Sequence, residues 1–525
     1  MANPSPSPGA RRPLNPPPRT AAGRCSRRAI LRALPLAVAA GITGCDLGPA
    51  DTELPPLTPL PVEVVNVPRY TPTPSPTQSA PTTLAAAEAT PLPAGTTIQF
   101  AGWGTPAELN ALRQSLAAFE QAQPEVDLDV RLDNALAGDG MRAGLVDGID
   151  ADVVRVAADD VFDLSAGGYL APLDEFVARD LELDDLAPAA IEARTGPGGE
   201  MTALSIGAAY LGVFYNEAHL ALAGVEPPSS WEDPWSIAEF EFAARRLTAA
   251  DEDRVDRYGL AAVPWVTRAA MAGAAGLGGA DAFFTPDQTR STMQSAVHAR
   301  TLGRMARWRS QSQIELGIEE RFGTPFNGGQ VALYVDASDF APLVRPTIPW
   351  GVAPLPAWTD GSPVTEGLEI CVGVNGAGED LEPAWRLAQF FLESEAQRAL
   401  ARTDAAVPFR RSVLREPAFR DPNRLPTDRT AWSGAIAHDL QTPSNPGSKA
   451  WHVLTGAPIE AVRRGDVEVE AYLEQADDLI TRQLEAHEWS LAKDVAGYRR
   501  PPSLGNVMLR EFDERREEKR RGSAP

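Results

Sequence analysis

The apolar positions of this chain predict an alternation of strands and helices that begins near residue 96. Residues 96–103 (TTIQFAGW) form an apolar strand, and residues 126–132 (VDLDVRL) alternate strictly between apolar and charged side chains, as a half-buried strand does. Between them, a 3-4-3 spacing places on one face of a helix Leu109, Leu112, Leu116 and Phe119. Strand, helix and strand in this order predict a βαβ unit with a parallel sheet.

Capping residues mark the ends of these elements. The segment Thr105–Glu108 supplies an N-cap, a first-turn proline and the acid of a capping box, so the first helix begins there. Residues 152–156 are apolar on both sides of Arg155, which predicts a third strand covered on both faces. A short helix at 159–166 is expected to end at Gly167.

The middle of the chain carries a longer apolar strand from residue 203. It meets Tyr215-Asn216, turns into a helix that ends at Gly224, and closes on Pro227-Pro228 and Trp231. Further helices are predicted at 237–247, 269–279, 385–401 and within 430–490. Covered strands that alternate with helices indicate the α/β class.

The N-terminus has the pattern of a bacterial export signal. The first 44 residues hold seven Arg and no acid, with an adjacent pair at Arg27-Arg28 typical of twin-arginine signals. The apolar run 33–42 is too short to span a bilayer and indicates a signal core. It leads to Gly44-Cys45, which resembles a lipoprotein cleavage site. We therefore expect a signal peptide at 1–44 and lipidation of Cys45, which would anchor the chain on the extracytoplasmic face of the cell membrane.

Composition separates the flanking segments from the folded region. Residues 46–95 contain twelve prolines among Thr, Ser and Ala, which predicts that 45–95 is a lipid anchor followed by a disordered linker. Residues 496–525 form a charged tail without a core pattern.

Charge and cysteine use narrow the function classes. The formal net charge is −23, and the chain without its first 44 residues has 41 basic and 71 acidic residues. This acidic balance argues against a nucleic-acid-binding protein, which needs a basic surface, although net charge can also reflect solubility alone. Beyond Cys45 only Cys371 remains, so the mature chain has no intramolecular disulfide.

Several motifs together resemble the family 1 extracellular solute-binding proteins, which are the receptors of carbohydrate ABC importers. The resemblance covers most of 96–415, and its motifs are Tyr215-Asn216-Glu217, Ala223-Gly224, Pro227-Pro228, Ser230-Trp231-Glu232, Trp350–Pro356, Thr365–Ile370, Trp385–Ala401 and Ala406–Arg410. The chain departs from the family pattern at Glu366, where a glycine is usual, and at Phe340, which stands near the usual tryptophan.

This resemblance implies a two-lobed fold of the periplasmic-binding-protein type II class. Each lobe would be a mainly parallel sheet flanked by helices, and the chain would cross between the lobes at three places, near 203–231, 365–370 and 406–410. The expected boundaries are 96–208 and 368–406 for the first lobe, and 209–367 and 407–495 for the second.

Candidate ligand contacts follow from the strand ends. Ligands of open α/β sheets bind beyond the carboxyl ends of the strands, which selects the loops that contain Trp103, Asp159 and Asp160. Trp103 stands between two glycines and could stack on a sugar ring, or else pack against the neighbouring helix. Trp265 follows another strand and is a second candidate for stacking.

The resemblance adds further candidates near the crossings. Tyr210 is expected to face the cleft, Asp336 occupies a loop of the second lobe, and Glu366 and Gly367 lie at the second crossing, where Glu366 would accept hydrogen bonds from sugar hydroxyls or from a cationic group. Tyr215 and Trp231 are expected to be scaffold.

Other functions have weaker support. The sequence has no zinc-protease, nucleophile-elbow, dinucleotide or P-loop motif, and the acids at 251–256 do not fit a calcium loop, so we expect no cofactor, no metal and no enzymatic activity. Two alternatives stay open: a polysaccharide-active surface lipoprotein and a ligand sensor not coupled to import. The expected partners of a monomeric receptor are a carbohydrate and ABC permease subunits, with membrane contact through lipid only.

Overall fold

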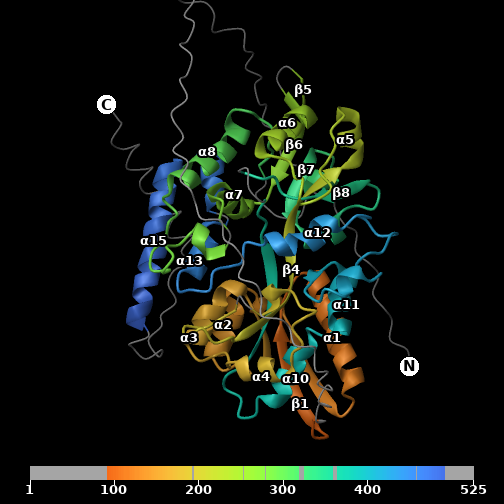
Figure 1. Cartoon of the computed structure of the whole chain (residues 1–525), viewed down its shortest axis with the longest axis vertical. Coiled ribbons are helices and arrows are strands. Elements are labelled where there is room, and N and C mark those ends of the chain that lie inside the picture. The colour runs from red at the N-terminus through yellow and green to blue at the C-terminus, as the bar shows by residue number, and fades with distance from the viewer. Residues whose placement is uncertain are drawn as a thin grey trace, which may run out of the picture. The chain divides into compact units, whose positions relative to one another are not determined.

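The computed structural model describes residues 92–191, 194–251, 254–277, 279–317, 324–358, 363–456 and 458–490. The predicted signal peptide, Cys45 and the tail at 496–525 lie outside these ranges. Among the residues that the structure describes, no helix combines the length and apolar character needed to cross a bilayer. Ten strands join into one twisted sheet that is divided between two lobes (Figure 1). The α/β class agrees with the strand and helix pattern, and the two lobes agree with the family resemblance.

Lobe 1, as we define it, is built on strands β1, β2, β3 and β9. Strand β1 pairs in parallel with β2 and β3, whereas β9 runs antiparallel to β3. The elements of this lobe are β1 (Thr96–Gly102), α1 (Pro106–Ala122), β2 (Val126–Leu132), η1 (Asn134–Leu136), α2 (Asp139–Val146), β3 (Val153–Val156), η2 (Ala158–Asp160), α3 (Val161–Ala166), α4 (Asp174–Asp180), η3 (Pro188–Ala190), β9 (Gly367–Val374), α10 (Glu382–Phe390), α11 (Ser394–Thr403) and β10 (Val407–Pro408).

Lobe 2 is built on strands β6, β7 and β8. Strands β6 and β7 are parallel, and the short strand β5 closes a hairpin with β6. The elements are α5 (Glu217–Ala223), α6 (Ile237–Leu247), β5 (Ala249–Asp251), β6 (Arg254–Ala262), α7 (Val266–Ala275), η4 (Gly279–Ala282), α8 (Ala296–Ser310), α9 (Thr324–Asn327), β7 (Val331–Ala337), η5 (Ser338–Leu343), β8 (Trp350–Ala353), α12 (Thr430–Ala435), η7 (Ile436–His438), α13 (Ser448–Leu454), α14 (Ile459–Arg463) and α15 (Val469–Ser490). The short helix η6 (Val413–Arg415) packs on α11 and β10 of lobe 1.

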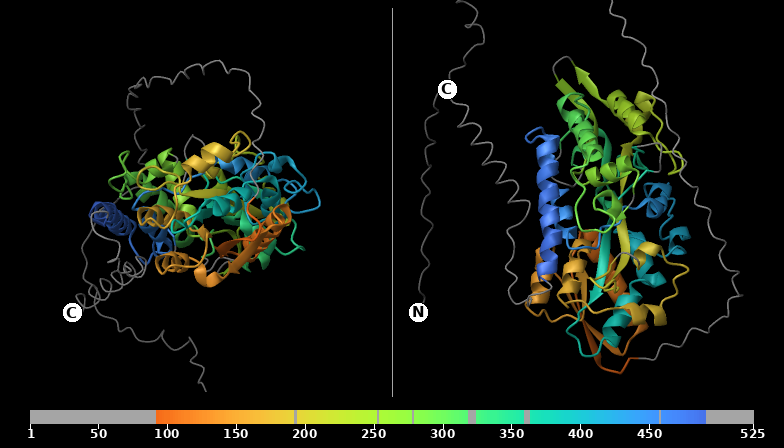
Figure 2. Two further views of the ribbon diagram at one scale, coloured as in Figure 1. Left: turned by 90° about the horizontal axis from the view of Figure 1, so that it is seen from below. Right: turned by 60° about the vertical axis from the view of Figure 1, so that its left-hand side comes forward.

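One long strand, β4 (Ala203–Asn216), belongs to both lobes. Its first half pairs with β9 on one edge and β10 on the other, and its second half pairs with β7 and β8. The partner changes between Tyr210, which faces Gly367 of β9, and Leu211, which faces Ala337 of β7. Every residue of β4 is buried except the half-buried Tyr215. The strand that the sequence predicted from residue 203 is therefore the central connection between the lobes (Figures 1 and 2).

The third crossing is tied to β4 by a buried amide. Gln397 of α11 donates from Nε2 to the Ile206 carbonyl (2.7 Å) and accepts at Oε1 from the backbone N–H groups of Phe409 (2.7 Å) and Arg410 (3.0 Å). Gly207 allows this close approach, because a Cβ there would lie 2.9 Å from the Val407 carbonyl oxygen.

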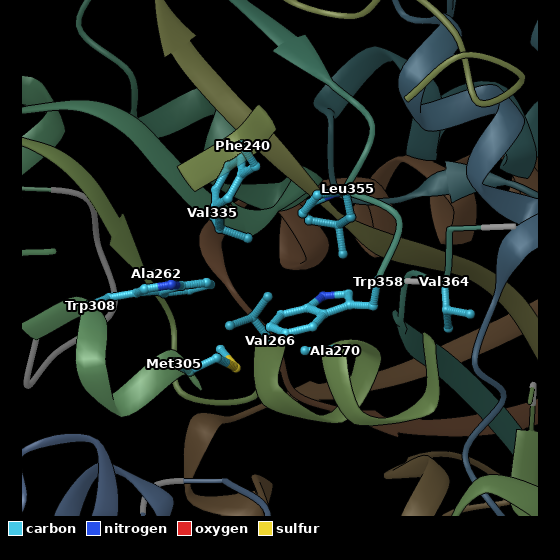
Figure 3. Close-up of a pocket in the computed structure, with 11 residues that line it drawn as sticks. Phe240, Ala262, Val266, Ala270, Met305, Trp308, Val335, Leu355, Trp358 and Val364 are labelled. Atoms are coloured by element: carbon cyan, nitrogen blue, oxygen red, sulfur yellow. The ribbon is translucent and has the colours of Figure 1, made fainter. Parts of the chain in front are cut away.

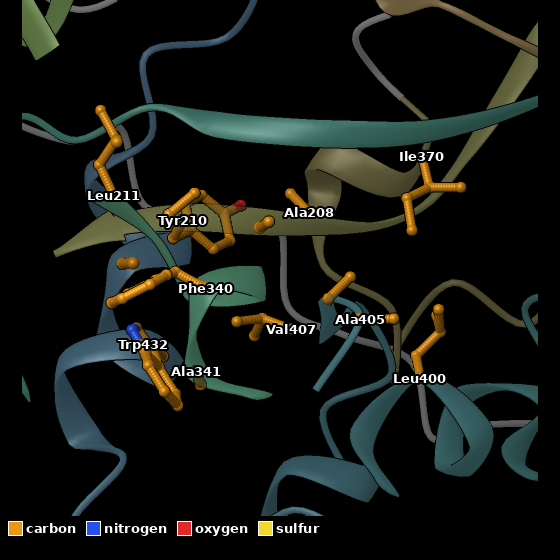
Figure 4. Packing of buried hydrophobic residues seen from close by; sticks show 14 of the residues in the cluster. Ala208, Tyr210, Leu211, Phe340, Ala341, Ile370, Leu400, Ala405, Val407 and Trp432 are labelled. Atoms are coloured by element: carbon orange, nitrogen blue, oxygen red, sulfur yellow. The ribbon is translucent and has the colours of Figure 1, made fainter. Parts of the chain in front are cut away.

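A continuous apolar core surrounds the crossings and extends into both lobes. Around β4 it contains Tyr210, Leu211, Phe340, Val407 and Trp432, which come from separate parts of the chain (Figure 4). A second core cluster joins α7, α8, α13 and α15 through Met271, Leu302, Trp451 and Tyr472, so these helices form one block of lobe 2.

Local structure follows the sequence signals closely. Helix α1 has the predicted capping box, with the Thr105 side chain bonded to Glu108 N–H and the Glu108 side chain to Thr105 N–H. Helix α5 ends at Gly224 in the left-handed conformation (φ 59°). The helix expected at 269–279 instead runs from Val266 to Ala275, because Gly276 adopts φ 68° and ends it.

Close packing of β6 on α6 generates a stability prediction. A Cβ at Gly259 would lie 1.8 Å from the Ala244 carbonyl oxygen, so Gly259→Ala must displace backbone, and we expect it to cost about 1–3 kcal/mol or more. Gly303→Ala in α8 is the control, because its Cβ would meet no atom closer than 3.7 Å and alanine favours helix. Urea denaturation measures both, and equal stabilities would contradict this packing.

Candidate functional site

The predicted site residues lie after strand ends, within β7 and at the hinge. Asp159 and Asp160 follow β3, Trp103 follows β1, and Trp265 follows β6. Tyr210, Glu366 and Gly367 lie at the point where β4 and β9 pass between the lobes. Asp336 was expected in a loop, but it lies on β7, because the pairing of β7 with β4 continues to Ala337. It is fully buried opposite Gly212 and accepts a hydrogen bond from Ala337 N–H (2.7 Å).

Trp103 contacts Arg155, which is bonded to the capping box of α1. Its ring is half-buried, and the Arg155 guanidinium lies over one face, 3.6 Å from the ring centre. Arg155 is buried and donates from Nη2 to Glu108 Oε1 (2.8 Å), the same carboxylate that caps α1. Both interpretations of Trp103 are thus compatible with its place: one face packs on protein, and stacking on a sugar would use the other face.

Asp159 and Asp160 form a buried acid pair that meets a cation from lobe 2. Lys449 of α13 places its Nζ 3.1 Å from Asp159 Oδ2 and 3.0 Å from Asp160 Oδ1. Burial and the neighbouring Asp159 charge raise the pKa of Asp160 to about 6. Burial also acts to raise the pKa of Asp159, but the positive charges nearby outweigh it and lower that pKa.

Glu366 forms an ion pair with Arg268 of α7. The two side chains are almost fully buried and form a two-pronged ion pair, with Nε 2.8 Å from Oε2 and Nη2 2.7 Å from Oε1. Arg268 also donates to the His452 carbonyl (3.3 Å) and lies over the Trp451 ring. Burial lowers the pKa of His452 to about 4, so this imidazole is neutral near pH 7.

Asp439 joins the two hinge strands. It accepts from Gly367 N–H at Oδ1 (2.9 Å) and from the Tyr210 hydroxyl at Oδ2 (3.2 Å). Tyr210 itself is fully buried, so the side chain expected to face the cleft is covered by Asp439. Burial, together with the negative charge of Glu369, raises the pKa of Asp439 to about 8.

Five predicted residues thus lie in a polar region made of three clusters: Asp159 and Asp160 with Lys449, Glu366 with Arg268, and Tyr210 and Gly367 with Asp439. Three residues that complete it were not predicted. For Arg268 the sequence predicted only that a helix begins nearby, and for the region of Asp439 and Lys449 it predicted only helices. One signal was available, because Lys449 is the single lysine between residues 92 and 490.

An apolar pocket lies nearby within lobe 2, with about 350 Å³ of empty space including its open mouth (Figure 3). Its walls include Phe240, Val266, Met305, Trp308 and Trp358. The lining contains no charged side chain, whereas hydroxyl-rich ligands need hydrogen-bonding groups. The polar region between the lobes is therefore the better candidate for a sugar site. Its groups can bind by hydrogen bonding, and binding alone needs no chemical step.

Comparison with known proteins identifies the class. Residues 103–398, more than half of the chain, match the family model described as bacterial extracellular solute-binding protein. The chain therefore belongs to this family of extracytoplasmic solute receptors, as its motifs predicted. None of the curated proteins compared with the chain gives a significant match.

Solved structures show the same two-lobed fold. The substrate-binding protein Lmo0181 from Listeria monocytogenes, in complex with cycloalternan, is 19% identical, with a TM-score of 0.63 over 74% of this chain and 99% of that one. The GacH receptor of Streptomyces glaucescens, studied with acarbose, is 21% identical, with a TM-score of 0.62 over 74% and 98%. The sugar-binding protein MalE from Xanthomonas citri is 19% identical, with a TM-score of 0.61 over 76% and 100%.

The Arg268–Glu366 pair gives a stability prediction. Arg268→Met leaves a buried carboxylate without its partner and should cost about 3–5 kcal/mol, and adding Glu366→Gln should restore part of this loss. The exposed pair of Arg482 and Asp478 provides the control, since Arg482→Met should cost less than about 1 kcal/mol. Chemical denaturation tests all these variants. Losses that simply add in the double variant would contradict the pairing.

Asp439 gives a pH prediction. Unfolding returns its pKa to the ordinary 3.8, so the folded state binds the extra proton and loses stability as pH rises through about 8. Asp439→Asn stays neutral and should be more stable than the native chain at pH 7, with the difference growing by about 1 kcal/mol by pH 9. Denaturation at the two pH values measures this growth, and a constant difference would show that Asp439 does not hold the proton.

Proposed function

We propose that this protein is the extracytoplasmic receptor of an ABC importer and binds a sugar or oligosaccharide between its lobes. The observation that carries the proposal is a set of buried acids paired with cations of lobe 2: Asp159 and Asp160 with Lys449, and Glu366 with Arg268. Carboxylates accept hydrogen bonds from hydroxyl groups, and an aromatic face binds the C–H face of a sugar ring.

Closure about the hinge would bury the solute, and the closed form would be recognised by permease subunits. The solute classes named for the related structures, cycloalternan and acarbose among them, support a carbohydrate. The lipoprotein signal supports delivery from a membrane-tethered monomer, with Cys45 as the lipid attachment site and the proline-rich linker as the tether. In this proposal the solute is bound without being chemically changed, and neither a cofactor nor a metal takes part.

A panel of sugars tests the ligand class directly. A bound solute should raise the melting temperature of the chain by mass action, and a reversible shift with the sugar recovered unchanged is the expected result. A panel without any stabilising sugar would contradict the carbohydrate assignment. Cleaved sugar would instead identify a polysaccharide-active lipoprotein.

Stacking by the two tryptophans gives the binding prediction. Trp103→Ala and Trp265→Ala should each weaken the binding of a stabilising sugar at least tenfold, about 1.4 kcal/mol, in titration calorimetry. Trp235→Ala is the matched control, because this half-buried tryptophan packs on Phe240 in lobe 2 and should affect stability rather than affinity. Unchanged affinity in both test variants would exclude this site.

A further inference from the structure

The stretch from η7 to α13 belongs to lobe 2 but contacts lobe 1 at several points. Trp451 of α13 is buried in the second core cluster with α7, α8 and α15. From the same stretch, the Thr442 carbonyl accepts from Arg194 Nη1 (3.1 Å) and the Ser444 hydroxyl donates to the Thr195 carbonyl (2.6 Å). Lys449 adds the ion pairs to the acid pair of lobe 1. These contacts bridge the two lobes.

The charge balance of lobe 1 explains the position of Lys449. Arg142 of α2 lies 3.5 Å from Asp160 and 3.1 Å from Asp163, so this cation of lobe 1 is shared by two carboxylates. Asp159 and Asp160 are nine-tenths buried or more, and buried carboxylates are costly without a partner. Lys449, with a side chain 23% exposed, supplies the second cation from the opposite lobe.

The residue type at this position is also informative. From residue 92 to residue 490, Lys449 is the single lysine, and arginine takes every other Lys or Arg position. An ammonium group is a compact charge with three donors and can bridge two carboxylates in a narrow space, where a planar guanidinium has less freedom. Its three N–H donors present to Asp159 and Asp160 what neighbouring hydroxyl groups of a sugar would present.

We propose that Lys449 is an autoinhibitory contact: an intramolecular competitor that occupies the acid pair and holds the lobes together until a solute takes its place. This inference rests on the proposed function, because it assumes that solute and Lys449 meet the same carboxylates. A solute then needs to displace the ammonium group, so removal of Lys449 opens the ligand-free chain and increases affinity.

Hydrogen exchange of the full chain without any solute tests the bridge by itself. In Lys449→Met, amides of residues 157–166 and 440–454 should exchange about tenfold faster, while those of β1 and β2 stay unchanged. In Lys449→Arg, which keeps the charge, the exchange rates of these amides should lie between those of the native chain and those of Lys449→Met. The control is Arg386→Met, which breaks the ion pair with Glu382 inside lobe 1 and should leave these amides unchanged. Equal exchange in Lys449→Met and the native chain overturns the proposal.

Two further measurements separate loss of the bridge from general destabilisation and from loss of a ligand contact. If Lys449→Met also accelerates amide exchange in β4, Asp160→Asn tests the same bridge from lobe 1. For the proposal to stand, Asp160→Asn must accelerate amide exchange in residues 440–454. With a sugar that stabilises the chain, Lys449→Met should bind about tenfold more tightly, whereas weaker binding overturns autoinhibition and makes Lys449 a ligand contact. A chain that binds no sugar refutes the proposed function, while the ligand-free exchange still decides the bridge.

Discussion

Strand β4 is the constraint on which the rest of the molecule depends. It pairs along its first half with β9 and, over two residues, with β10, and along its second half with β7 and β8. A strand paired in this way cannot leave either sheet without exposing backbone groups that need partners. Relative motion of the lobes is therefore confined to the place where its partners change, between Tyr210 and Leu211.

The position of an ion pair relative to this hinge determines whether it is fixed or can separate. Close to the hinge the structure buries ionised groups in pairs, as with Arg268 and Glu366, and Arg194 and Glu369. Such pairs add little net stability, but removing one partner is costly, so they favour one arrangement of the crossings. Farther out, Lys449 and the acid pair face each other from opposite lobes, where separation returns both to water. Ion pairs thus fix the arrangement of the crossings near the hinge, whereas the ion pair between the lobes can separate.

The sequence predicted most of the fold because its signals are local. The capping box at Thr105–Glu108, the alternation in β2 and the glycine that ends α5 each depend on neighbours within a few residues. The site was predicted only in part, because its members meet through tertiary contacts. Asp159 and Lys449 lie in different lobes and far apart in the sequence, and no periodicity connects them. Burial of Tyr210 beneath Asp439 is likewise a property of packing and not of the strand pattern.

Diffraction from crystals of the chain grown with a stabilising sugar tests the central claim most directly. We expect a sugar between η2 of lobe 1 and α13 of lobe 2, with the Lys449 ammonium displaced from Asp159 and Asp160. Compared with the structure described above, one lobe should be rotated against the other about a point near Tyr210 and Leu211. A sugar bound within one lobe alone, such as in the apolar pocket beside Trp358, with the Lys449 bridge intact, would contradict it.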